Sequence, residues 1–157
     1  MDSNEQISLL KKHFINEGIY EFTPVNELKI IEFENNNDVL IPSDLKQYFT
    51  LINGSGDVPL DNLYEFYNIK RFNKIFDEFK DWEGIPDYSQ LDYKKFDNVF
   101  VFGNYEFNFY SFGIELFKSH KFTNRVFIFC GGEYRIIADS FYSFIDVYLN
   151  HPDEIFI

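Results

Sequence analysis

Residues 32–54 constrain the fold of this chain more than any other stretch, because residue type and residue spacing agree there. The ring of Pro42 disfavours a helical conformation at Ile41, so an earlier helix must end in the polar run before it. Ser43 then has the position of a helix cap, and Asp44 lies near the positive end of the next helix. The stretch therefore predicts two helices that meet at a sharp corner.

The second helix of this corner has a continuous apolar face. Its apolar residues recur three and four positions apart, at Leu45, Tyr48, Phe49 and Ile52. Asn53 and Gly54 suit the end of the helix, where a left-handed residue is common. We expect Glu32, near the end of the first helix, to hold the corner by accepting hydrogen bonds from backbone amides rather than to lie in solvent. The corner is thus predicted to be architectural and not catalytic.

The rest of the first half is also mainly helical in pattern. Ser3 and Gln6 have the spacing of a capping box before a helix over residues 4–16. Thr23 and Pro24 suit the start of the helix that leads into the corner. The expected inward face of that helix is Val25, Leu28, Ile31 and Phe33. A strand over residues 60–69, a helix bearing Phe72, Ile75, Phe76 and Phe79, and a long loop over residues 81–97 follow.

The second half has the pattern of a sheet. Strands are expected over residues 99–102, 107–112, 114–117 and 126–130, with a turn at Gly103-Asn104. Gly131-Gly132 predicts a hairpin, so residues 133–138 should return antiparallel. Ser140 or Asp139 caps a final helix with an apolar face made of Phe141, Phe144, Ile145 and Tyr148. Helices followed by strands predict one α+β domain, an antiparallel or mixed sheet covered by helices.

Charge and composition narrow the classes of function. The 157 residues carry a net charge of -12, a field that repels nucleic acid and anionic membranes and speeds encounters with basic proteins. The polar, acidic start lacks the pattern of a signal peptide, and no stretch is long and apolar enough to cross a membrane. A lone cysteine, Cys130, fits a reducing compartment. We therefore expect a cytoplasmic protein that binds neither nucleic acid nor membranes.

The sequence contains no convincing catalytic, metal-binding or cofactor-binding pattern. His13, His120, His151 and Cys130 lie far apart, without the close pairs typical of zinc sites, and no phosphate-binding loop is present. Close carboxylate pairs occur at Asp57 with Asp61, at Asp77 with Glu78 and Asp81, and at Glu83 with Asp87. With 26 acidic residues such pairs arise by chance, so we expect solvated surface rather than a hydrolase site.

The only tryptophan lies in the most acidic surroundings of the chain. We predict a partner-binding site formed by Asp77, Glu78, Asp81, Trp82, Glu83 and Asp87. In one interpretation Trp82 is an exposed aromatic anchor, and the carboxylates around it steer a basic protein surface. In the other, Trp82 folds inward and fixes the loop. The sequence does not distinguish the two.

These residues carry a resemblance to a known family. Glu32, Ile41-Pro42, Asp44, Tyr48-Phe49 and Asn53-Gly54, followed near the end by Ser140-Phe141, resemble the signature of the SUKH superfamily, which includes the yeast Smi/Knr cell-wall synthesis regulators and many bacterial proteins. The matches bracket residues 23–149 of a single SUKH-like domain over residues 1–157. The resemblance implies that these motif residues are structural and that the fold is α+β.

For bacterial members the resemblance also implies a function. Such proteins serve as immunity proteins that neutralise toxins of contact-dependent or polymorphic toxin systems, commonly nucleases. An acidic inhibitor suits that role because nuclease domains are often basic. The sequence therefore favours a non-enzymatic protein that binds a basic toxin domain. A regulatory scaffold that binds a cellular protein is the second hypothesis, and a carboxylate-dependent hydrolase is the third.

Overall fold

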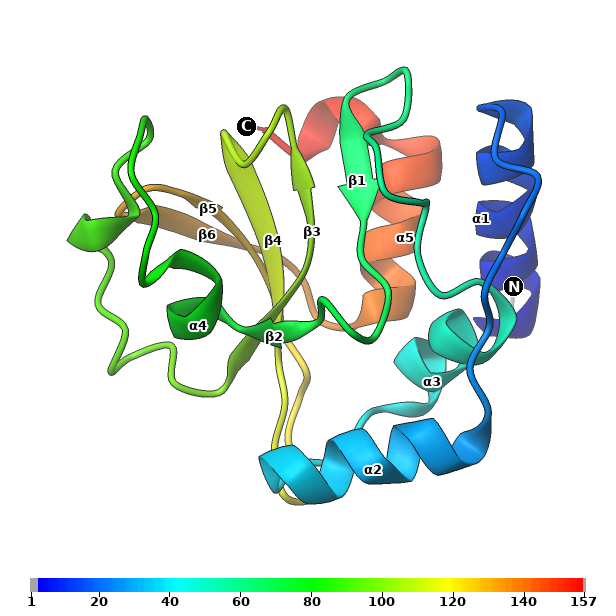
Figure 1. Ribbon diagram of the computed structural model, residues 1–157, viewed down its shortest axis with the longest axis horizontal. Helices are drawn as coiled ribbons and strands as arrows, with labels where there is room; N and C mark the ends of the chain where they lie inside the picture. The colour runs from blue at the N-terminus through cyan, green and yellow to red at the C-terminus, as the bar shows by residue number, and fades with distance from the viewer. Residues whose placement is uncertain (1–2, 157) are drawn as a thin grey trace.

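The computed structural model describes residues 3–156, which form five α-helices, two 3-10 helices and six strands within that range. Figure 1 shows helices and sheet packed into one domain. The elements in chain order are α1 (Ser3–Asn16), α2 (Glu27–Asn37), α3 (Ser43–Leu51), β1 (Tyr64–Phe66), β2 (Asn73–Lys74), α4 (Ile75–Phe79), η1 (Tyr88–Gln90), β3 (Val99–Tyr105), β4 (Tyr110–Glu115), β5 (Val126–Cys130), β6 (Glu133–Ala138), α5 (Phe141–Asn150) and η2 (Pro152–Glu154). The α+β prediction is confirmed.

The strands form one antiparallel sheet in the order β1-β3-β4-β5-β6. The short strand β2 pairs with the first half of β3, on the same edge where β1 pairs with the second half. The hairpin at Gly131-Gly132 is confirmed, and β5 and β6 have the predicted bounds. The turn predicted at Gly103-Asn104 is wrong, because both residues lie within β3. A Cβ atom at position 103 would lie 2.6 Å from the Glu65 carbonyl oxygen. Gly103 therefore allows the close approach of β1 to β3 and does not form a turn. The actual reversal passes through three residues with positive φ at positions 106–108.

The sheet is buried on both faces, because alternate residues of its central strands point into two different clusters. Phe100 and Phe102 of β3 contact the larger cluster, which includes the apolar faces of α1, α3 and α5. Val99 and Val101 of the same strand contact a smaller cluster under α4 and η1. Figure 1 shows α1 and α5 on one side of the sheet and α4 on the other. The segment from α4 to η1 is therefore the cover of the second face.

The corner predicted around Pro42 is confirmed in its main features. Leu45, Tyr48 and Phe49 of α3 are fully buried, and the Tyr48 hydroxyl donates a hydrogen bond of 2.6 Å to the Tyr67 carbonyl. Gly54 has a positive φ and packs against the backbone of residues 66–68. Asn53 joins two segments, because its side chain donates to the Thr23 carbonyl and accepts from the Ile69 amide.

Two details of this corner differ from the prediction, and Asp44, which lies in the first turn of α3 as predicted, makes an additional contact. The cap position of α3 is Pro42, and Ser43 is the first helical residue. Asp44 accepts a hydrogen bond from the Tyr142 amide, so it ties α3 to the start of α5. Glu34, rather than Glu32, accepts the 2.7 Å hydrogen bond from the Ile41 amide, while Glu32 is exposed beside Lys29. The prediction for Glu32 is wrong because the helix turns the carboxylate two positions later toward the corner.

The inward face predicted for α2 is confirmed for Phe33 and for Val25 before it, which pack against the core, but is wrong for Leu28 and Ile31. The helix begins after Asn26, whose side chain caps the Lys29 amide, and not at Thr23 and Pro24. Its buried residue is Ile30, whereas Leu28 is 72% exposed and Ile31 is 42% exposed. The later start of the helix is not the cause of this difference in burial, because it leaves the spacing between Leu28, Ile30 and Ile31 unchanged. The core contacts the side of α2 that carries Ile30 and Phe33.

The middle of the chain forms shorter elements than its composition predicts. The strand expected over residues 60–69 is limited to β1, and α4 has five residues. Phe72 is buried before β2, while Phe76 is more than half exposed. The final helix follows the prediction closely: the Ser140 hydroxyl accepts from the Ser143 amide, and Phe141 is fully buried.

Candidate partner-binding site

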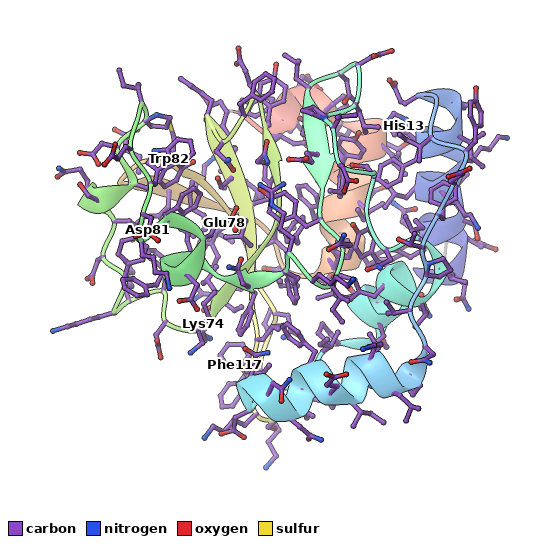
Figure 2. The ribbon with its side chains drawn as sticks, viewed as in Figure 1. His13, Lys74, Glu78, Asp81, Trp82 and Phe117 are labelled. Carbon is purple, nitrogen blue, oxygen red and sulfur yellow. The ribbon has the colours of Figure 1, made fainter. Side chains whose placement is uncertain are left out.

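The predicted acidic site lies on the cover of the second sheet face, from α4 to η1. Figure 2 shows Glu78, Asp81 and Trp82 on this side of the molecule, with Trp82 and Glu78 toward the sheet. The apolar side chains of the segment pack inward, and Phe79 stacks on Tyr88 with ring centroids 3.7 Å apart. The carboxylates that point outward are therefore carried by a packed and not by a loose segment.

Trp82 is half-buried against this packing. Its indole N–H donates a 2.9 Å hydrogen bond to the Pro86 carbonyl, and its ring meets Phe79 and Tyr88 edge-on, each at 5.7 Å. These contacts correspond to the interpretation in which Trp82 fixes the loop. The aromatic surface that a partner could still reach is the part of the ring that remains exposed.

Four of the predicted carboxylates lie on the surface: Asp77, Asp81, Glu83 and Asp87. Asp77 lies 3.7 Å from the Lys80 ammonium, a distance typical of a weak surface pair. Asp87 accepts hydrogen bonds from the Ser89 hydroxyl and amide, at 2.7 and 3.0 Å, and these bonds lower the pKa of its carboxyl group. The four carboxylates form an outward negative surface, which we call the acidic segment.

Glu78 differs from the other four predicted carboxylates because it turns inward. Its carboxylate lies 3.5 Å from the Arg71 guanidinium, which also pairs with Glu65 at 2.9 Å. Burial raises the pKa of Glu78 above that of an ordinary glutamate. Arg71 stacks over the Tyr67 ring, 3.8 Å from its centroid. Glu78 thus belongs to a network inside the domain rather than to the acidic segment.

This network was not predicted from the sequence. Asn104 completes it, because its side chain donates to Glu65 at 2.9 Å and to the Tyr67 hydroxyl at 2.8 Å. The members come from β1, the loop after it, α4 and β3, so no local spacing connects them. The one signal of this network in the sequence is Asn104, a polar residue within an apolar run. A turn accounts for a polar residue at that position equally well.

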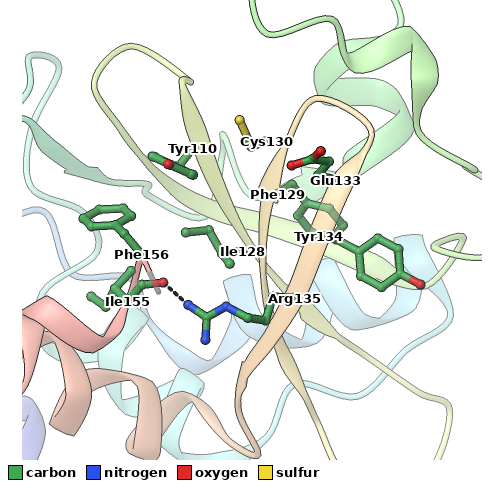
Figure 3. Close-up of a pocket in the computed structure, with 9 residues that line it drawn as sticks. All are labelled: Tyr110, Ile128, Phe129, Cys130, Glu133, Tyr134, Arg135, Ile155 and Phe156. Carbon is green, nitrogen blue, oxygen red and sulfur yellow. Dashed lines mark hydrogen bonds between the residues drawn. The ribbon is translucent and has the colours of Figure 1, made fainter.

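A separate cavity of about 300 Å³ lies beside the β5–β6 hairpin (Figure 3). Its charged lining residues are Glu133 and Arg135, and the Arg135 guanidinium donates to the Ile155 carbonyl. Burial, with Glu133 nearby, raises the pKa of the Cys130 thiol, which opposes formation of a reactive thiolate. The lining residues include no histidine that could act as its base. This cavity does not resemble a nucleophilic active site.

Within residues 3–156, no three histidine, cysteine or acidic residues converge in a group able to hold a metal ion. The helices of that range also include none long and apolar enough to cross a membrane.

Comparison with known protein families tests the resemblance that the motif residues carry. The model of the SMI1 / KNR4 family (SUKH-1) matches residues 24–147, more than three quarters of the chain. The chain belongs to the SMI1/KNR4 family. No curated protein matches it. The resemblance predicted from the corner and the final helix is therefore confirmed.

Membership in the SMI1/KNR4 family is consistent with a role in binding or in toxin immunity. The matched residues begin before α2 and end within α5, so they include the acidic segment and the corner but not α1. In this member of the family α1 nevertheless belongs to the core, since Ile7, Leu10 and Phe14 are buried in the larger cluster. Most residues that carry the resemblance are buried or cap a helix, as Tyr48, Phe49 and Ser140 do, whereas Glu32 is exposed and the acidic segment presents its charges outward.

Proposed function

We propose that this protein is a non-enzymatic immunity protein, which binds and neutralises a basic toxin domain in the cytoplasm. The observation that carries the proposal is the acidic segment of a SMI1/KNR4 family member, fixed on a sheet cover by Trp82, Phe79 and Tyr88. Fixed charges reduce the ordering cost of association. A negative surface of this kind accelerates encounter with a cationic domain, such as a nuclease.

The first experiment tests neutralisation in cells. The genes beside the one for this protein are searched for a toxin domain, which is expressed with and without this protein while survival is measured, and a neighbourhood without any toxin gene would count against the proposal. The proposal expects survival only when both are present. Cell death despite soluble expression of this protein would contradict it, and capture of a housekeeping complex instead would favour a regulatory scaffold.

The second experiment tests the acidic segment through the rate of association. Binding of a catalytically inactive toxin domain is measured at low and high salt for wild type and for Asp81→Lys/Glu83→Lys. We expect the wild-type rate to fall by about tenfold at high salt, and the variant to be slow at both concentrations. The matched control, Asp61→Lys/Asp153→Lys, reverses two exposed charges elsewhere and should retain most of the wild-type rate.

A further inference from the structure

Helix α2 exposes an apolar ridge. At about 100° per residue, positions 28 and 31 share one face of a helix, and position 30 points to the other side. Ile30 accordingly lies in the core, while Leu28 and Ile31 face solvent. Figure 1 shows α2 at the periphery, running along one edge of the domain. We call Leu28, Ile31 and the flanking Glu27 and Glu32 the α2 ridge.

The fold does not need the ridge side chains. Ile30 and Phe33 attach the helix, the latter by stacking on Phe72 with ring centroids 5.1 Å apart. Asn26 caps the start of the helix, and Glu34 fixes its end to the corner. The exposed part of the ridge surface therefore adds little stability to the free protein, since it stays in contact with solvent. Covering it in a complex would release the free energy of burying an exposed leucine and isoleucine.

The charges beside the ridge define the partner. Glu27 and Glu32 lie on either side of the two apolar residues, and both carboxylates are more than half exposed. Each carboxylate already has a lysine partner: Lys46 is 4.0 Å from Glu27, and the Lys29 ammonium donates a 3.4 Å hydrogen bond to Glu32. Such surface pairs are weak, so each carboxylate can accept a second cationic donor. An apolar side chain flanked by arginine or lysine is the complementary surface, whereas a second acidic copy of this chain is disfavoured.

The surroundings of the ridge leave room for such a partner. An open groove of about 580 Å³ runs beside α2, so the helix stands above the surface on that side. Its wall on α2 is formed by Lys29, Glu32, Phe33 and Asn36, and the opposite wall by Asn53, Asp57, Asn68, Ile69 and Lys70. Most of the residues that line the groove have polar side chains, which can donate or accept hydrogen bonds at the rim of an apolar contact.

We propose that the α2 ridge is the surface on which the basic toxin domain docks, with an apolar side chain over Leu28 and Ile31 and cationic side chains against Glu27 and Glu32. This inference rests on the proposed immunity function and adds the contact that holds the complex together. The acidic segment sets the association rate, and the ridge sets the dissociation rate, since buried apolar contacts act mainly on dissociation.

The test measures the Kd and the dissociation rate of the inactive toxin domain encoded beside the gene. Wild type is compared with Leu28→Ser/Ile31→Ser. The control is Leu9→Ser/Ile15→Ser on α1, where the two apolar residues are 40% and 39% exposed. We expect the α2 variant to bind at least about tenfold more weakly through faster dissociation, with an unchanged melting temperature, and the control to bind like wild type.

Each outcome decides between the claims. If wild type binds and the α2 variant binds as tightly as the α1 control, the inference is overturned while the immunity function stands. If wild type binds no toxin domain encoded beside the gene, the proposed function fails and the inference fails with it. A dimer of this chain that the α2 substitutions abolish would assign the ridge to a second copy and also overturn the inference.

Discussion

Helices α2 and α3 are neighbours in the chain with similar apolar spacing, yet they bury their residues differently. In α3, Leu45, Tyr48 and Phe49 are inaccessible to solvent. In α2, Leu28 and Ile31 remain exposed, and Ile30 enters the core instead. Helical spacing thus identifies an apolar face but does not show what covers it. For α3 the cover is the domain itself, and for α2 we propose that it is a partner.

The largest expected effect is on the core face of α3. Phe49→Ala should lower the free energy of unfolding by about 3–5 kcal/mol, because it leaves a cavity beside Tyr48 and Phe72. Leu28→Ala should change it by less than about 0.5 kcal/mol, since its side chain is mostly in solvent already. Urea unfolding measures both. If Phe49→Ala does not fold, Phe49→Leu provides a milder comparison. A Leu28→Ala loss as large as that at position 49 would place the ridge in the core.

A smaller effect separates the two carboxylates at the end of α2. Glu34→Ala leaves the Ile41 amide without its 2.7 Å hydrogen bond, so we expect a loss of about 1–2 kcal/mol. Glu32→Ala removes only an exposed group paired with Lys29, and the loss should be below about 0.5 kcal/mol. The same unfolding measurement compares them. Equal losses would mean that Glu34 does not hold the corner.

The smallest effect concerns α1, which is covered by the domain as α3 is. The His13 ring nitrogen lies 2.9 Å from the Tyr148 hydroxyl, and burial lowers the pKa of His13 although Glu17 opposes the shift. The folded state therefore binds a proton less readily than the unfolded state, whose histidine pKa is about 6.5. The resulting stability is complete above that pH and decreases as the pH falls toward the folded pKa.

We expect the stability of wild type relative to His13→Gln to decrease between pH 7.5 and pH 5.5, values chosen about one unit on either side of the unfolded pKa. Both proteins are unfolded in urea at each pH, so titrations elsewhere in the chain cancel. A difference that stays constant or grows at the lower pH would show that His13 is not held in its neutral form.

The sequence predicted the parts of the fold that depend on local residue chemistry. Pro42, Gly54, the Gly131-Gly132 turn and Ser140 each restrict or satisfy the backbone next to them, and the elements they bound were predicted well. The backbone effects of these residues need no knowledge of distant segments. The apolar spacing of α3 and α5 also identified their buried faces, although similar spacing in α2 did not.

The features that were missed depend on contacts between distant segments. Asn104 was placed in a turn, because its partners Glu65 and Tyr67 lie about forty positions earlier along the chain. Glu32 and Glu34 are both glutamates near the end of the same helix. Only the position of the corner determines that Glu34 accepts the hydrogen bond from the Ile41 amide. The exposure of Leu28 could not be predicted either, since it depends on the side of α2 that faces the sheet.

The most direct test of the account is the accessibility of leucine and isoleucine methyl groups to a soluble paramagnetic probe, measured by NMR with and without the inactive toxin domain. We predict that the methyl groups of Leu28 and Ile31 are accessible in the free protein and protected in the complex. Those of Leu45 and Ile52 should be protected in both states. Protection of Leu28 and Ile31 in the free protein, or their continued accessibility in the complex, would contradict the account.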